Sequence, residues 1–115
     1  MKGVSKSKSD GYEGVINVFE TVFREVKEQA KKKAEATLNA SKVRMINKIL
    51  EDVRAVVDDE PEAKYLELLD DDELPQMGDA VIVMAQYEGA LKGFRARHYG
   101  WDPFNREQGW FIEGK

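Results

Sequence analysis

The first half of the chain has a helical pattern of apolar and polar residues. From Tyr12 onward, apolar side chains recur at intervals of three and four residues, and charged side chains occupy most positions between them. The apolar positions are Val15, Ile16, Phe19, Val22, Phe23, Val26 and Ala30. This spacing predicts an amphipathic helix.

The apolar pattern weakens over residues 27–42 and returns over residues 43–57. Two structures are compatible with this interruption. In the first, Asn39 ends one helix in a left-handed cap and Ser41 begins another, which gives an antiparallel helical hairpin. In the second, one long helix continues through the join, because its alanine, lysine and glutamate residues favour helix. We therefore expect a helical arm over residues 12–57, either as a hairpin or as one long helix.

Residues 58–78 are rich in acidic residues. Pro61 suits the first turn of a helix, and the acidic residues before it suit the positive end of the helix dipole. We therefore expect an acidic hinge that contains a short helix over residues 61–70, with Leu66 and Leu69 facing inward.

After Gly78, the spacing of apolar residues becomes typical of a β-strand, in which every second side chain lies on the same face. Residues 79–87 are rich in β-branched side chains, residues 90–99 form a second candidate strand, and residues 109–114 form a third. This pattern predicts a three-stranded antiparallel β meander over residues 79–115, which needs a helix against one face. The expected fold is therefore α+β, with an N-terminal helical hairpin (or one long helix) and a short helix packed on a C-terminal β meander.

The length of 115 residues fits one domain, which we assign to residues 12–115. Residues 1–11 are small, polar and basic, and they are expected to form a disordered tail. The absence of cysteine excludes disulfides, thiolate nucleophiles and cysteine-ligated metals. The sequence also contains no apolar run of the roughly 20 residues that a membrane span needs, and its start lacks the apolar middle of a signal peptide. We therefore expect a cytoplasmic protein that does not bind membranes.

The net charge of −4 is unevenly distributed along the chain. Residues 1–54 carry a net charge of +4, residues 55–80 carry −9, and residues 81–115 carry +1. The C-terminal third therefore lacks the strong basic excess that nucleic-acid-binding proteins usually show.

Few catalytic arrangements are compatible with this sequence. His98 is the only histidine, and a Ser-His-Asp arrangement would require Ser41 to reach it from another element. The acidic run does not match a calcium-binding loop: with Asp70 at the first position, Pro75 replaces the glycine and Val81 replaces the final glutamate. A Gly-rich phosphate loop is also missing. We therefore expect no catalytic residues, no metal site and no cofactor.

Arginine and aromatic residues are concentrated near the C-terminus. If residues 90–99 form a strand, alternation places Arg95, Arg97 and Tyr99 on one face. Together with Arg106, they form a candidate binding surface for a protein or for single-stranded nucleic acid. The residues expected to build the core of the sheet are Phe94, Trp101, Phe104, Trp110 and Phe111. The further candidates for nucleic-acid contact are Lys31, Lys32 and Lys33.

The helical arm offers a candidate oligomer interface. A three-stranded sheet would cover only part of the apolar stripes of a helical hairpin, and exposed apolar patches generally mark protein contacts. The residues expected at this interface are Phe19, Phe23, Val26 and Ile49. We therefore expect a homodimer or a larger homo-oligomer.

Three features of residues 73–114 are shared with a known family. They are a Leu74-Pro75 lead-in, Gly78 before the β-branched residues 81–83, and a later strand that contains Trp110. In these features the segment resembles the short β module of small phage and prophage proteins grouped as domain of unknown function 551. The resemblance implies an origin in a phage or another mobile element, and it implies no activity.

The sequence thus predicts a small non-enzymatic protein-interaction module. It is expected to self-associate through its helical arm and to present its arginine and aromatic strand surface to an unidentified protein partner. The alternative is a nucleic-acid-binding protein that uses the basic helix and strand residues, whose affinity would fall steeply with salt concentration.

Overall fold

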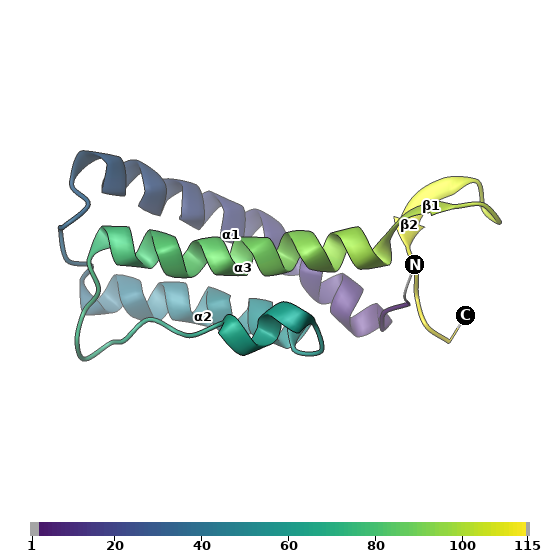
Figure 1. Cartoon of the computed structure of the whole chain (residues 1–115), viewed down its shortest axis with the longest axis horizontal. Coiled ribbons are helices and arrows are strands. Elements are labelled where there is room, and N and C mark those ends of the chain that lie inside the picture. The colour runs from purple at the N-terminus through teal and green to yellow at the C-terminus, as the bar shows by residue number, and fades with distance from the viewer. Residues whose placement is uncertain (1–2, 115) are drawn as a thin grey trace.

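The computed structural model describes residues 3–114, which form three long helices, one short 3₁₀ helix and a two-stranded antiparallel sheet (Figure 1). In chain order, the elements are α1 (Lys6–Lys32), α2 (Ala40–Val57), the 3₁₀ helix η1 (Pro61–Tyr65), α3 (Met77–His98), β1 (Tyr99–Asp102) and β2 (Glu107–Trp110). The fold is α+β, as the sequence predicts, and most of it is helical.

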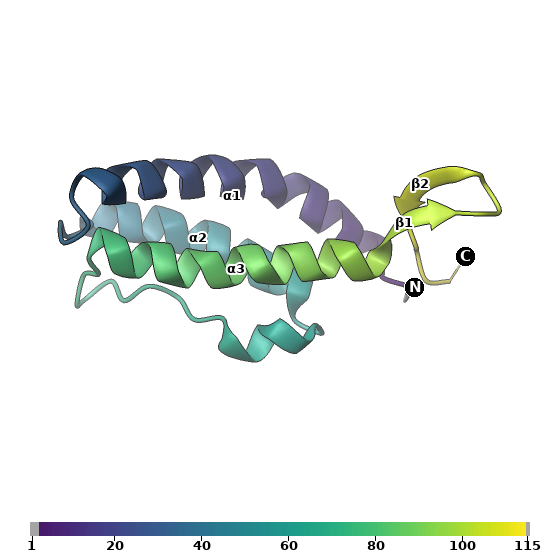
Figure 2. The ribbon, with the colours of Figure 1, turned by 45° about the horizontal axis from the view of Figure 1, so that its top comes forward.

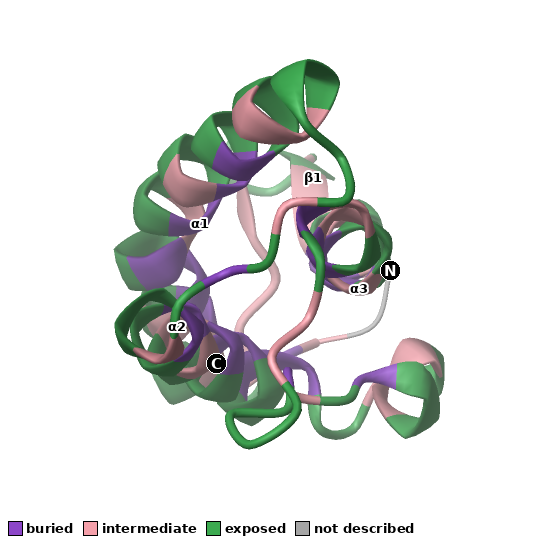
Figure 3. Ribbon diagram, turned by 90° about the vertical axis from the view of Figure 1, so that its left-hand side faces the viewer, coloured by how far each residue is buried: buried purple, intermediate pink, exposed green. Residues whose placement is uncertain are grey.

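The three long helices pack lengthwise into a bundle. α1 runs antiparallel to both α2 and α3, and residues 58–76 return along the bundle, so that α3 runs in the same direction as α2 (Figures 1 and 2). In a view along the bundle, buried segments of the helices face the interior (Figure 3). The largest fully buried side chains include Phe19, Leu38, Ile46, Leu50, Met84, Tyr87, Leu91 and Phe94. One core therefore holds the helices together, and α1 and α2 belong to this bundle instead of an arm packed on a sheet.

Ser5 and Asn39 cap the first two helices. The Ser5 hydroxyl accepts a hydrogen bond from the backbone N–H of Lys8 at 3.2 Å. The Asn39 side chain accepts one from the backbone N–H of Lys42 at 2.8 Å, and its own φ of −79° is not left-handed. Asn39 therefore begins α2 and does not end α1. Residues 33–39 separate the two helices, so one long helix is excluded.

The start of the chain is ordered where a disordered tail was expected. Val4 is buried, its N–H donates to the carbonyl of Phe111, and its own carbonyl accepts from Glu113, each at 2.8 Å. The prediction of disorder is wrong for residues 3–11, because these contacts with the C-terminal segment offset the entropy lost on ordering. Residues 1 and 2 lie outside the described residues.

Residues 58–76 form the acidic connection between α2 and α3. Their helical part is η1, which has five residues and is shorter than the helix expected over residues 61–70. Leu66 and Leu69 are buried, as predicted. The side-chain NH₂ of Asn47 donates to the carbonyl of Leu69, and its side-chain oxygen accepts the N–H of Leu69, each at 2.8 Å. These contacts hold the connection against the bundle.

The largest departure from the expected fold is α3, which replaces two strands of the meander. Its buried positions follow helical spacing and include Ala80, Met84, Tyr87, Leu91 and Phe94. Their burial against α1 and α2 outweighs the strand propensity of the β-branched residues 81–83. The three-stranded meander over residues 79–115 is therefore wrong. The described sheet contains only β1 and β2, with Tyr99 opposite Trp110.

Candidate functional site

The β1–β2 hairpin projects beyond one end of the bundle (Figures 1 and 2). α3 leads directly into β1, and the N–H of Tyr99 donates to the carbonyl of Arg95 as in the last turn of a helix. The N–H of Phe111 donates to the carbonyl of His98 at 2.8 Å. The hairpin is therefore anchored at its base, while its tip lies away from the bundle.

The tip is a turn that local hydrogen bonds hold in one shape. The Asp102 carboxylate accepts the backbone N–H of Phe104 at 2.9 Å, and it accepts the side-chain amide of Asn105 at 2.7 Å. The N–H of Arg106 donates to the Asp102 carbonyl at 2.7 Å, and Arg106 has a left-handed φ of 57°. Pro103 fixes a further backbone torsion. The pKa of Asp102 lies below its usual value, chiefly because its carboxylate accepts the Phe104 N–H.

The aromatic side chains of the hairpin become more exposed toward its tip. At the base, the Trp110 ring packs against Tyr12 and Phe94, with centroids 5.1 and 5.6 Å apart. Toward the tip, Trp101 is 54% exposed and Phe104 is 94% exposed. The prediction that Trp101 and Phe104 lie in a core is wrong, because no layer of the bundle covers a hairpin that projects from its end. Phe94 is fully buried, as predicted.

A recess lies on the hairpin beside Phe104. Gly100 pairs with Gly109, so neither residue contributes a side chain to the middle of the sheet. A cavity of about 720 Å³ is lined by the turn, by β2 and by the segment after it, including Phe104, Gly109 and Ile112. The tip therefore presents a protruding ring and an adjacent recess.

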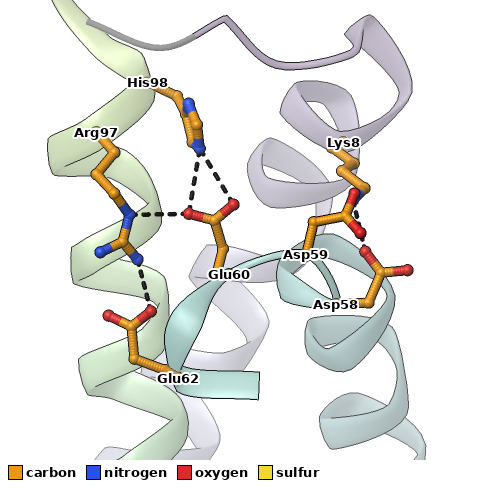
Figure 4. A network of polar contacts seen from close by, with 7 residues as sticks. All are labelled: Lys8, Asp58, Asp59, Glu60, Glu62, Arg97 and His98. Carbon is orange, nitrogen blue, oxygen red and sulfur yellow. Dashed lines mark hydrogen bonds and ion pairs between the residues drawn. The ribbon is translucent and has the colours of Figure 1, made fainter. Parts of the chain in front are cut away.

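Four side chains form a polar cluster at the base of the hairpin (Figure 4). This basal cluster consists of Glu60, Glu62, Arg97 and His98. Glu60 accepts a hydrogen bond from Arg97 Nε at 2.9 Å, and both of its oxygens lie 3.2 Å from His98 Nε2. Glu62 accepts from Arg97 Nη2 at 2.6 Å. Burial alone would lower the pKa of Arg97, but Glu62 and Glu60 outweigh it and raise this pKa above its usual value.

The basal cluster is largely shielded from solvent. The side chain of His98 is 3% exposed and that of Glu60 is 10% exposed. The His98 ring also packs edge-on against Phe94, with centroids 4.9 Å apart. The cluster therefore fastens the residues around η1 to the end of α3, where the hairpin begins.

A second group of charges lies beside the basal cluster. Lys8 of α1 donates hydrogen bonds to Asp58 and Asp59, which follow α2 (Figure 4). Burial alone would lower the pKa of Lys8, but the hydrogen bonds to the two carboxylates raise it. These ion pairs connect the start of α1 to the end of α2.

The predicted binding residues are dispersed in the structure. Arg95 stacks over the ring of Tyr99 at the hairpin base, 4.1 Å from the ring centroid. Arg97 belongs to the basal cluster and does not join them on an open face. Arg106 lies in the turn, and residues 31–33 lie at the end of the bundle far from the hairpin (Figure 1). The residues selected from the sequence therefore do not form one cationic surface.

The predicted oligomer interface lies inside the bundle. Phe19, Phe23 and Val26 are 0%, 3% and 6% exposed. Ile49 is half-buried and packs against the core. α3 covers the apolar stripes that a small sheet would have left open. The prediction of an interface is therefore wrong for Phe19, Phe23 and Val26, and it stays a prediction for Ile49.

The acidic run lies at the surface. Asp70, Asp71 and Asp72 offer carboxylate oxygens within 4.8 Å of one another. The Asp70 carboxylate accepts the backbone N–H of Asp72 at 2.8 Å and that of Glu73 at 3.0 Å, and these hydrogen bonds lower its pKa. Asp70 thus closes a local turn.

Comparisons with protein-family models, with curated proteins and with solved structures found no match to this chain. The resemblance of residues 73–114 to domain of unknown function 551 therefore stays a prediction. Within the described residues, none of the helices combines the length and the apolar character needed to cross a membrane.

Two features of this region were not predicted: the turn with Phe104 at its apex and the contact between Glu60 and His98. Only the turn can be recognised from the local sequence. Aspartate followed by proline is a common start of a tight turn, so the segment from Asp102 to Asn105 indicates a turn with Phe104 at its apex. The contact between Glu60 and His98 joins residues 38 positions apart and has no local signal.

Proposed function

We propose that this chain is a non-enzymatic protein-interaction module that inserts the tip of its hairpin into an apolar pocket of a partner protein. The main support is Phe104, which is 94% exposed on a turn held by hydrogen bonds. An exposed phenylalanine contributes little to the stability of its own chain, because its apolar surface remains in water. Trp101, which is 54% exposed, lies on the strand that leads into this turn.

Burial of the tip in a partner would supply much of the binding free energy. Full burial of a phenylalanine side chain stabilises by roughly 2–3 kcal/mol, and tryptophan is common among the residues that dominate interfaces. Asp102 and Pro103 hold the turn before binding, so little conformational entropy is lost when Phe104 is buried. The recess beside Phe104 would receive a side chain of the partner.

The charges of the hairpin favour a protein partner over a nucleic acid. Residues 99–110 carry Asp102, Arg106 and Glu107, which give a net charge of −1 and would not attract phosphates. Arg97 is paired with two carboxylates, and residues 31–33 lie at the other end of the bundle. Nucleic-acid binding through the basic helix and strand residues is therefore the weaker candidate.

Site-specific photo-crosslinking in cells that express the full chain tests this proposal. A photoreactive phenylalanine analogue at position 104 should give a discrete protein adduct, because the partner would surround this side chain. The matched control carries the analogue at Met45 of α2, which is 51% exposed. Trp101→Ser should reduce the adduct at position 104, because it removes part of the contact.

The control position and a nuclease treatment make the result decisive. Equal adduct yields from positions 104 and 45 would contradict a binding role of the hairpin. An adduct at position 104 that nuclease digestion removes would instead support the nucleic-acid alternative.

A further inference from the structure

α3 differs from the other long helices on its outward face. α1 and α2 carry charged residues along their outward faces, whereas residues 80–87 of α3 include none. The exposed residues between positions 80 and 89 of α3 are Ile82, Ala85, Gln86 and Gly89, and their spacing places them on one side of the helix. We call these four residues the α3 stripe. A helical segment that lacks charges on both its inner and outer faces, as residues 80–87 do, is typical of one that is covered on both.

A cleft lies beside the α3 stripe, between η1 and α3. It has a volume of about 450 Å³ and is lined by Glu62, Tyr65, Leu66, Gln86 and Gly89. A Cβ at Gly89 would meet no atom within 4 Å beyond the neighbouring residues and nearby backbone of its own helix, so packing within this chain does not require a glycine here. Glycine inside a helix is less stable than alanine. The small residue is therefore explained better by something that approaches α3 from outside.

We propose that the α3 stripe binds a second copy of this chain, with the two α3 helices antiparallel about a two-fold axis between residues 85 and 86. Ile82, which is 62% exposed, then lies opposite Gly89 of the partner subunit. The same contact forms a second time, because a two-fold axis relates the two copies. Each isoleucine occupies the space that the missing side chain leaves at the cleft.

The charges at the ends of the α3 stripe favour a second copy over an unrelated protein. Asp79 and Lys92 are both exposed, and they lie at equal distances in sequence from the proposed axis. The antiparallel pairing therefore brings Asp79 level with Lys92 of the partner subunit at both ends of the contact. It also places the two helix dipoles in opposite directions, which is favourable. One helix face thus supplies both halves of a complementary interface.

The pairing leaves both hairpins available. Each hairpin follows the C-terminal end of its own α3, so an antiparallel pair carries the two tips at opposite ends of the dimer. This dimer does not depend on the proposed role of the hairpin.

Single-cysteine crosslinking tests the dimer, since the chain contains no cysteine of its own. Gln86→Cys places a thiol next to the proposed axis, and mild oxidation should give a disulfide-linked species of twice the 13.1 kDa chain mass. Ala55→Cys is the matched control, because Ala55 is also exposed but lies on α2, and it should stay mostly monomeric. Equal crosslinking of both variants would overturn the proposal. A wild-type chain that sediments as a monomer at every concentration would also overturn the proposed dimer. The α3 stripe would then be available to another partner.

Two further substitutions test which residues meet in the dimer. Ile82→Lys should raise the dimer Kd by on the order of 100-fold or more, because it brings two charges into an apolar contact, while the monomer stays folded. Gly89→Ala should raise the Tm of the monomer, since alanine favours helix and its Cβ meets no atom within 4 Å. The same substitution should weaken the dimer about tenfold, because its Cβ takes space that Ile82 needs. Unchanged dimer affinity in both variants would overturn the pairing.

Discussion

Phenylalanine side chains are buried in the bundle but exposed in the hairpin. In the bundle, Phe19 and Phe94 are fully buried, and their apolar surface stabilises the fold. In the hairpin, Phe104 is almost fully exposed, and hydrogen bonds to Asp102 define the shape of the turn. The proposed function therefore assigns stability and binding to different regions, which can be changed one at a time.

The largest effect on stability is expected from Phe94→Ala. The Phe94 ring contacts Tyr12, His98 and Trp110, and truncation of such a buried ring typically costs about 3–5 kcal/mol. Phe104→Ala should change the free energy of unfolding by less than about 0.5 kcal/mol, because its ring is exposed. Urea denaturation followed by circular dichroism measures both values. Equal losses would show that the two regions do not differ in this way.

A smaller loss is expected at the boundary between the two regions. Glu60→Ala should lower the free energy of unfolding by about 2 kcal/mol, because it leaves Arg97 and His98 without their shared carboxylate. Glu62→Ala is the matched control and should cost less than about 1 kcal/mol, because this side chain is more exposed and its ion pair with Arg97 is screened by solvent. Urea denaturation of both variants gives the comparison. A greater loss from Glu62→Ala would contradict the central place of Glu60 in the basal cluster.

A gain in stability that is confined to the hairpin is expected from Arg106→Gly. Arg106 has a φ of 57°, which glycine adopts without strain, so the substitution should stabilise the turn by about 1 kcal/mol. Amide hydrogen exchange should slow in the hairpin and stay unchanged in the bundle. Glu107→Gly is the control, and it should speed exchange in β2, because glycine weakens a strand. Slower exchange in the bundle as well would mean that the two regions open together.

The smallest effect is expected at the turn in acid. The pKa of Asp102 lies below its unfolded value, chiefly through the Phe104 N–H, so its stabilising contribution is complete above about pH 3.9. The contribution should disappear as the pH falls through the lower, folded pKa. The amide resonance of Phe104 in NMR spectra should report this titration. Asp102→Asn keeps an acceptor but has no acidic proton, so it should remove the pH dependence of the Phe104 amide resonance. A titration that persists in this variant would show that another group is responsible.

The sequence predicts the buried faces of helices that have a charged side. The spacing places Val15, Phe19, Phe23 and Val26 on the apolar face of α1, and all four are buried there, although the last three were expected at an oligomer interface. α3 has no charged side over residues 80–87, so its pattern cannot separate a helix from a buried strand, and its β-branched residues favour the wrong choice. The feature that misleads the fold prediction is thus the one on which the proposed dimer rests.

At the candidate site, the sequence identifies the region but not the residues. Alternation at a period of two places Arg95 and Arg97 on one face, whereas in the helix only Arg97 reaches the acidic side chains near η1. Exposure of Trp101 and Phe104 depends on where the bundle ends, and this follows from how three helices pack. Such long-range contacts are not visible in local spacing.

α3 continues directly into β1, so the helix and the hairpin form one continuous segment. α3 has 22 residues, and at 1.5 Å per residue it is about 33 Å long. Core contacts hold α3 along its length, from Met84 and Tyr87 in its middle to Phe94 and His98 near its C-terminal end. The hairpin therefore cannot tilt relative to the bundle unless the buried side chains at the end of α3 repack.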